Sequence, residues 1–198
     1  MVERAFFDVS WMAVRGRLDA PLLAALDLSE AVEVPWARGL SAVLGDDWDA
    51  DAADDASLSR VFVVDVPGRE WCCLIGGWFG DTGEDARVVE ACMQASRLRG
   101  EAYAFTTQGR MDWYAWMAAS EGSLRRRFVW SGEPAVVEGI ALPDERWSDA
   151  GAFHEDVVCA LATRHAAGPD EYREPFPDGL LATTTRGRAN GVIVARSG

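Results

Sequence analysis

The sequence contains no lysine: all nineteen of its lysine-plus-arginine positions are arginine. A protein without lysine cannot form a Schiff base or anchor pyridoxal phosphate, and it lacks the lysine that P-loop NTPases and protein kinases require. Several large classes of enzyme are therefore excluded. The preference for arginine, together with abundant Ala, Gly, Val and Asp, indicates a GC-rich genome, so the individual arginines need no functional explanation.

Histidine and metal-binding motifs are also scarce. His154 is followed by Glu155, but Val158 stands where an H-E-x-x-H zinc motif needs its second histidine. His165 would lie three helical turns further on, about 16 Å away, which is too far to share a metal. The four cysteines form no CxxC pair. We therefore expect no metal or other cofactor, and cysteines that are reduced and buried.

No apolar run approaches the roughly 20 residues that span a bilayer, and the first residues do not resemble a secretory signal. The net charge of −13 opposes binding to phosphate backbones and favours a basic partner. We therefore expect a cytoplasmic protein that binds neither a membrane nor nucleic acid.

Six aspartates within residues 46–55 suggest a calcium loop. An EF-hand beginning at Asp47 needs glycine at its sixth position and glutamate at its twelfth, where the chain has Ala52 and Leu58. The segment is better interpreted as a solvated acidic loop.

A glycine-rich loop at residues 76–83 precedes a predicted helix. It fits neither the dinucleotide-binding nor the P-loop pattern. Acidic residues at the start of that helix oppose a bound phosphate, and Thr82 to Asp85 is more simply a capping box.

Hydrophobic periodicity and turn residues predict a single α+β domain over residues 1–198. A mostly antiparallel sheet of about five to seven strands, within residues 61–142, would pack against two main helices at 84–98 and 153–166. Residues 170–198 are expected to form a partly mobile tail. Short N-terminal helices are predicted at 19–28 and 35–44, and strands at 6–14, 61–66, 71–75, 101–107, 112–119, 124–130 and 135–142.

The hairpin of residues 112–130 is the candidate binding surface. Its turn at Gly122 allows two registers: one places Trp116 beside Arg127, and the other gathers four aromatic rings on one face. The simpler interpretation is a sheet with one face on the core and its arginines in water. The functional alternative is an aromatic floor edged by arginine, suited to a small aromatic or anionic ligand or a peptide. The candidate residues are Trp113, Tyr114, Trp116, Arg125, Arg126, Arg127, Phe128 and Trp130.

Candidates for acid–base catalysis are His154, Glu101 and Asp112. Such groups need only be close in space, and spacing along the chain does not select among them.

A series of short segments occurs in a characteristic order: Trp11, 22–28, 60–63 with Trp71, Gly76, 103–107, 114–116, 122–126, 132–133, 138–139 and the helix from Phe153. In these segments the chain resembles an uncharacterised, largely actinobacterial protein family. The resemblance covers most of residues 8–166, ends at about Asp170, and implies kinship of fold and a bacterial cytoplasmic setting; the family carries no activity that could be transferred.

Two functions are compatible with these observations. The first is a non-catalytic binding protein, similar to an immunity or adaptor protein, that uses its acidic surface and the Trp/Arg sheet face against a basic protein partner. The second is a small biosynthetic enzyme, independent of metal and nucleotide, with acid–base chemistry in an aromatic pocket.

Overall fold

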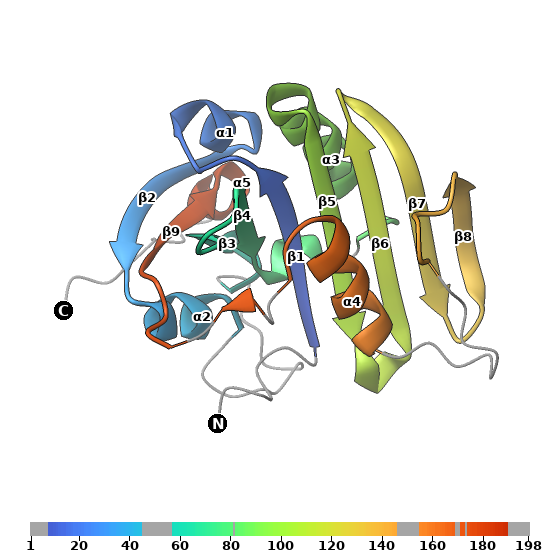
Figure 1. Ribbon diagram of the computed structural model, residues 1–198. Helices are drawn as coiled ribbons and strands as arrows, with labels where there is room; N and C mark the ends of the chain where they lie inside the picture. Colours follow the sequence, from blue (N-terminus) through green and yellow to red (C-terminus); the bar gives the residue numbers. More distant parts are fainter. Residues whose placement is uncertain are drawn as a thin grey trace.

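The computed structural model describes residues 8–44, 57–80, 82–145, 155–168, 171–172 and 174–189. These residues build one nine-stranded sheet in the order β2-β9-β3-β4-β1-β5-β6-β7-β8, and every neighbouring pair is antiparallel (Figure 1). The strands are β1 (Asp8–Arg15), β2 (Leu28–Val34), β3 (Arg60–Asp65), β4 (Trp71–Ile75), β5 (Glu101–Gln108), β6 (Trp113–Ser120), β7 (Ser123–Ser131), β8 (Pro134–Gly139) and β9 (Gly179–Thr184). The helices are α1 (Ala20–Ala25), α2 (Trp36–Leu44), α3 (Ala86–Arg99), α4 (Glu155–His165) and α5 (Thr185–Ala189).

The predicted α+β class is confirmed, but the expected five to seven strands were too few. Strands β1, β2 and β9 join the sheet from outside residues 61–142. Strand β9 lies between β2 and β3, so residues 179–184 are an internal strand where a partly mobile tail was expected. Residues 192–195, whose Val, Ile and Val predict a short strand, and the acidic loop of residues 46–55 lie outside the described residues.

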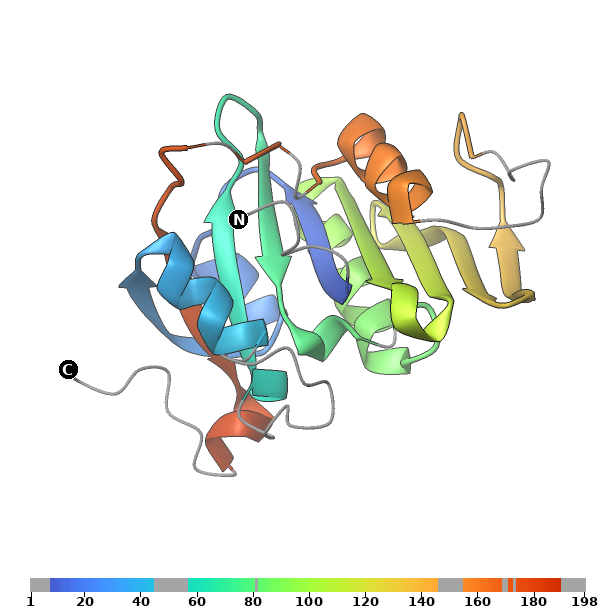
Figure 2. The ribbon, with the colours of Figure 1, turned by 90° about the horizontal axis from the view of Figure 1, so that it is seen from below.

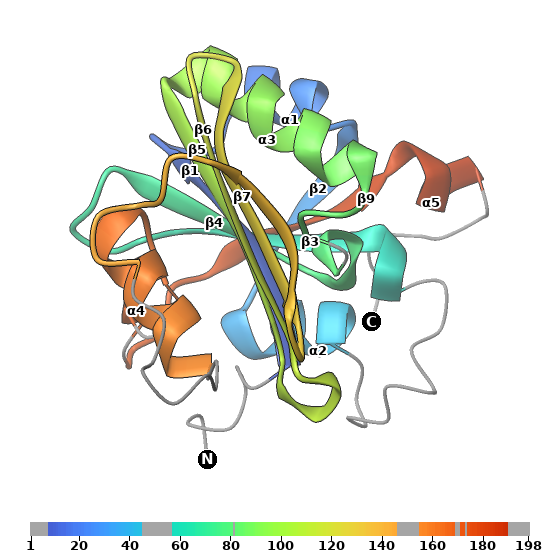
Figure 3. The same cartoon turned by 90° about the vertical axis from the view of Figure 1, so that its right-hand side faces the viewer.

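Helices cover both faces of the sheet, as the view of the sheet from its edge shows (Figure 3). Helices α1 and α3 pack on one face through Leu22, Val88 and Cys92, and α2 and α4 pack on the other through residues such as Trp36 and Val158. Successive residues of a strand point to opposite faces of the sheet, and both faces are covered by apolar side chains. This explains why the central strands are almost continuously hydrophobic.

Local signals set the ends of the helices. The Asp19 side chain accepts a hydrogen bond from the Leu22 N–H and caps α1, whose first turn contains Pro21. Helix α3 is capped by Asp85, which accepts from the Arg87 N–H, and Gly100 follows its last residue with φ of 85°. The expected capping box is wrong in one respect: Thr82 instead donates to the Phe79 carbonyl.

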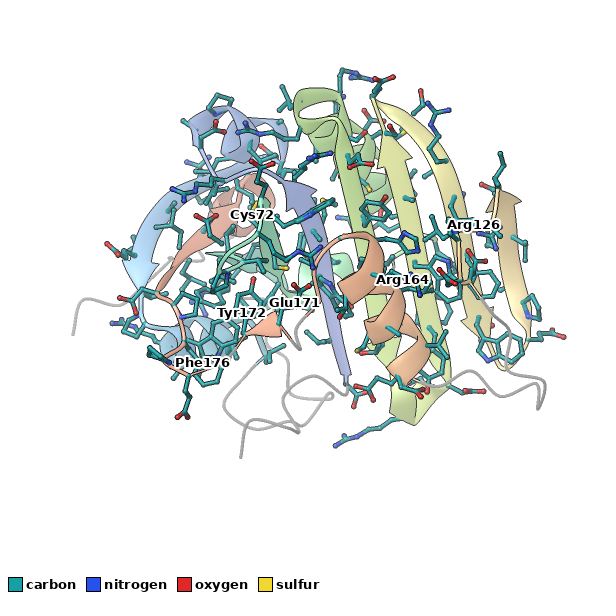
Figure 4. The ribbon with its side chains drawn as sticks, in the orientation of Figure 1. Cys72, Arg126, Arg164, Glu171, Tyr172 and Phe176 are labelled. Atoms are coloured by element: carbon teal, nitrogen blue, oxygen red, sulfur yellow. The ribbon has the colours of Figure 1, made fainter. Side chains whose placement is uncertain are left out.

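The segment after α4 is held against the core. The Trp36 ring lies 4.7 Å from the ring of Tyr172 and 5.1 Å from that of Phe176, all centroid to centroid. Glu171 binds Arg69 at 2.5 Å and accepts from the Gly168 N–H. Figure 4 shows Tyr172 and Phe176 beside α2, and Glu171 nearer to β1. This segment therefore leads the chain from α4 to the internal strand β9.

None of the helices among the described residues is long and apolar enough to cross a membrane.

Candidate functional site

The β6–β7 hairpin adopts the register that gathers the aromatic rings on one face. Its loop has two residues, Glu121 and Gly122, between the paired Ser120 and Ser123, and both loop residues have positive φ, 51° and 78°. This is the backbone of a type I′ turn. The register then shifts by one residue at Arg125, so that Trp116 pairs with Phe128 and Tyr114 with Trp130.

This aromatic face belongs to the core. Trp116 and Phe128 are fully buried and stack with their ring centroids 4.1 Å apart. Tyr114 and Trp130 are also buried, and the four rings share a hydrophobic cluster with residues of α4 such as Leu161. The expectation of an exposed aromatic floor is therefore wrong for these four residues. Trp113, the fifth aromatic candidate, is partly buried.

The three consecutive arginines of β7 have different environments. Arg125, the additional residue at the register shift, is exposed. Arg127 is partly buried; its Nε donates to the Gly83 carbonyl and its Nη1 lies 3.5 Å from Glu138 Oε2. Arg126 is buried, with 3% of its side chain exposed. The predicted row of solvated arginines therefore does not form.

Arg126 is the centre of a buried polar network. Its Nε donates to Glu145 Oε2 at 3.0 Å, and its Nη2 donates to Glu145 Oε1. Glu145 Oε2 also accepts from the Trp116 indole at 3.1 Å and from the Leu142 N–H at 2.9 Å. Arg126 Nη1 donates to the carbonyls of Glu138 and Gly139. The network thus joins β6, β7, β8 and the segment that follows β8 (Figure 4).

Sequence reasoning missed Glu145, although a signal for it was present. Arg126 shares its strand face with Phe128 and Trp130, so alternation places it on the buried side. A buried arginine needs a carboxylate partner. That argument predicts a buried acid elsewhere in the chain but does not identify it. Glu145 follows a proline turn, and no periodic pattern marks it as buried.

The candidate catalytic residues do not form a single site. Glu101 begins β5 and binds Arg15 at 3.0 Å, whereas the exposed Asp112 lies just before β6, beside the opposite end of β5. Seven residues of extended chain separate the two ends, about 23 Å. His154 lies outside the described residues. The other histidine, His165, has its Nε2 2.7 Å from the Pro143 carbonyl oxygen.

The glycines of the 76–83 loop serve close packing. A Cβ on Gly76 would lie 2.6 Å from the Arg60 carbonyl oxygen, and one on Gly83 would lie 2.6 Å from a methyl group of Val129. Their small size therefore lets the loop approach β3 and β7. Within the described ranges, no cluster of three or more His, Cys, Asp or Glu residues could hold a metal ion.

The four cysteines are free and buried, as the sequence predicted. Burial raises the pKa of the thiols of Cys73 and Cys92 to about 12, and that of Cys72 is raised for the same reason. We expect the folded protein at pH 8 to react with an aromatic disulfide reagent at least about 100-fold more slowly than the urea-unfolded chain, because the thiolate is the nucleophile. A thiol in the folded protein that reacted as fast as free cysteine would contradict this.

Strand β8 is the outermost strand at the hairpin end of the sheet, next to β7 (Figures 1 and 2). All of its residues except the half-buried Val136 are exposed, and Val137 and the following Ile140 expose 54% and 86% of their surface. These are large fractions for branched apolar side chains. Apolar surface is thus available at this edge, although the aromatic rings beside it are covered.

Comparison with known proteins returned no match to a family model, to a curated protein or to a solved structure.

Proposed function

We propose that this protein is a non-catalytic binding protein that associates with a basic protein partner. The observation that carries the proposal is the packing of the β6–β7 hairpin. Four of its rings, those of Tyr114, Trp116, Phe128 and Trp130, fill the space between the sheet and α4 and belong to the hydrophobic core. The enzymatic alternative relied on a pocket lined by such rings, and its candidate acids Glu101 and Asp112 lie at opposite ends of β5. The same packing covers the Trp/Arg sheet face, so we infer that the partner contacts another part of the surface.

Charge supports the same proposal. The sequence has 32 acidic and 19 basic residues, a net charge of −13. Ion pairs leave this excess unchanged, because each one, such as Arg126 with Glu145 or Arg69 with Glu171, uses one base and one acid. A field of this sign accelerates encounter with a positively charged protein and disfavours acidic ones.

The test is native mass spectrometry of the protein purified from its own host at low ionic strength. We expect a stoichiometric complex with a protein of basic isoelectric point. The complex should dissociate as salt is raised toward about 1 M, because the screening length then falls to about 3 Å. An unrelated protein of similar net charge, passed through the same extract, controls for nonspecific adsorption.

Two results would contradict the proposal. One is a small molecule that stays bound at high salt and is released only on unfolding, which would favour the enzyme or a ligand carrier. The other is a protein that remains free of any partner after cross-linking inside its own cells.

A further inference from the structure

Strand β8 offers an open edge for a further strand. It ends the sheet formed by the described residues, and its only strand neighbour there is β7. From Val136 to Gly139 it pairs with β7 in an unbroken register. An edge strand presents backbone N–H and C=O groups that another extended chain can pair with.

The edge is held in a fixed position by side chains from β7. The Arg126 guanidinium donates to the Glu138 carbonyl at 3.1 Å and to the Gly139 carbonyl at 3.4 Å. The Ile140 N–H donates to the Arg125 carbonyl at 3.2 Å. Gly139 has φ of 77°, and a Cβ there would lie 2.0 Å from the Arg125 carbonyl oxygen, so the chain leaves β8 at a position that only glycine accepts. A partner strand would therefore meet a preorganised template.

The side chains along this edge are apolar and acidic. Val137 and Ile140 are exposed. The two acids of this edge, Glu133 and Glu138, are exposed too, and residues 131–140 contain no basic residue. Glu138 keeps 55% of its side chain exposed even though it faces Arg127. A strand added outside β8 would lie beyond the arginines of β7 and next to these acids. Charge complementarity thus favours a basic segment over a second copy of this acidic chain.

The opposite edge of the sheet is less suitable. Both edge strands have a register shift, but the shift in β8 lies near its start, between Pro134 and Val136, and leaves Val136 to Gly139 unbroken. In β2 the shift lies between Ser29 and Val32, in the middle of the strand, and such irregularities turn an edge away from further pairing. Its exposed apolar residue, Val32, is 44% exposed. It therefore provides a matched control.

We propose that the edge of β8, which no other described strand occupies, binds an extended segment of the partner by strand addition, with alternating apolar and basic side chains that contact Val137 and Ile140 and the neighbouring glutamates. This inference rests on the proposed function and specifies the partner's chemistry and the surface that receives it.

The test uses a capped peptide of alternating lysine and valine, about eight residues long to match a strand, titrated into isotope-labelled full-length protein. We expect amide shifts in residues 135–140. The double variant V137S/I140S should bind at least about tenfold more weakly, which corresponds to 1.4 kcal/mol, whereas V32S on β2 should bind as the unaltered protein does. A peptide in which every internal amide is N-methylated should not bind, since neither of its edges then has N–H groups to pair with a strand.

Four results would overturn the inference: no binding of the peptide, shifts confined to β2, equal binding of V137S/I140S, or a dimer that V137S/I140S dissociates, which would assign the edge to a second copy. A host complex that survives V137S/I140S would reject the β8 edge while leaving the proposed function intact. Absence of any host complex would instead reject the proposed function.

Discussion

Replacing Arg126 by methionine should lower the free energy of unfolding by about 3–5 kcal/mol. The substitution leaves Glu145, with 2% of its side chain exposed, without its cationic partner, and removes the donor that joins the Glu138 and Gly139 carbonyls. A buried carboxylate cannot recover these interactions from water. Urea denaturation followed by tryptophan fluorescence measures the loss as a change in midpoint at constant slope.

An exposed ion pair provides the matched control for this prediction. Arg164 Nε lies 2.9 Å from Asp144 Oδ2, with 64% and 35% of the two side chains exposed. Arg164→Met should therefore cost no more than about 1 kcal/mol. Adding Glu145→Leu to Arg126→Met should restore part of the stability, since an uncompensated charge is then no longer buried. A cost below 1 kcal/mol for Arg126→Met alone would show that solvent reaches Glu145.

The secondary structure is predictable here wherever signals are local. Helix α3 combines an aspartate cap, an apolar stripe and a following glycine, and its predicted limits, 84–98, differ from the observed Ala86–Arg99 by only one or two residues. The β6–β7 hairpin is likewise predicted from its turn, since Gly122 readily takes the positive φ that this position requires, but the turn alone left two registers open. Where nearby residues set the backbone conformation, as helix caps and turn glycines do, the element can be predicted from the sequence.

Long-range pairing is not predictable in the same way. Strand β9 follows a proline-containing segment and resembles a tail, yet it pairs with β2 and β3, which lie more than a hundred residues earlier. No local pattern specifies which strand receives it. The candidate site was misjudged for a related reason. Alternation places Trp116, Phe128 and Trp130 on one face, but only the position of α4 decides that this face is covered.

The high tryptophan content is therefore largely a property of the core. Trp11, Trp36, Trp71, Trp116 and Trp130 are all at most 9% exposed. A large sheet covered on both faces needs bulky side chains to fill the space beneath short helices, and tryptophan buries more area than any other residue. Tryptophan abundance alone thus does not distinguish a binding surface from a packed interior.

Trp11→Ala is expected to cost about 3–5 kcal/mol of unfolding free energy. Trp11 lies on the central strand β1 and is fully buried, and its ring stacks on Phe105 with centroids 5.2 Å apart. Its indole N–H donates to the Ala167 carbonyl at 3.1 Å, which fixes the segment after α4 to the middle of the sheet. Alanine would leave a cavity and also free that connection. Urea denaturation monitored by circular dichroism measures the effect without relying on tryptophan fluorescence.

Two further substitutions separate packing from the hydrogen bond. Trp11→Phe keeps most of the ring contact with Phe105 but leaves the Ala167 carbonyl without its indole donor, so it should cost about 1–3 kcal/mol. Trp78→Ala removes a tryptophan that is only partly buried and should cost about 1 kcal/mol. If Trp11→Ala were no more harmful than Trp78→Ala, the segment after α4 would not be anchored through β1. The packing of this segment against the sheet, and the path of the chain into β9, would then depend on the contact between Trp36 and Tyr172.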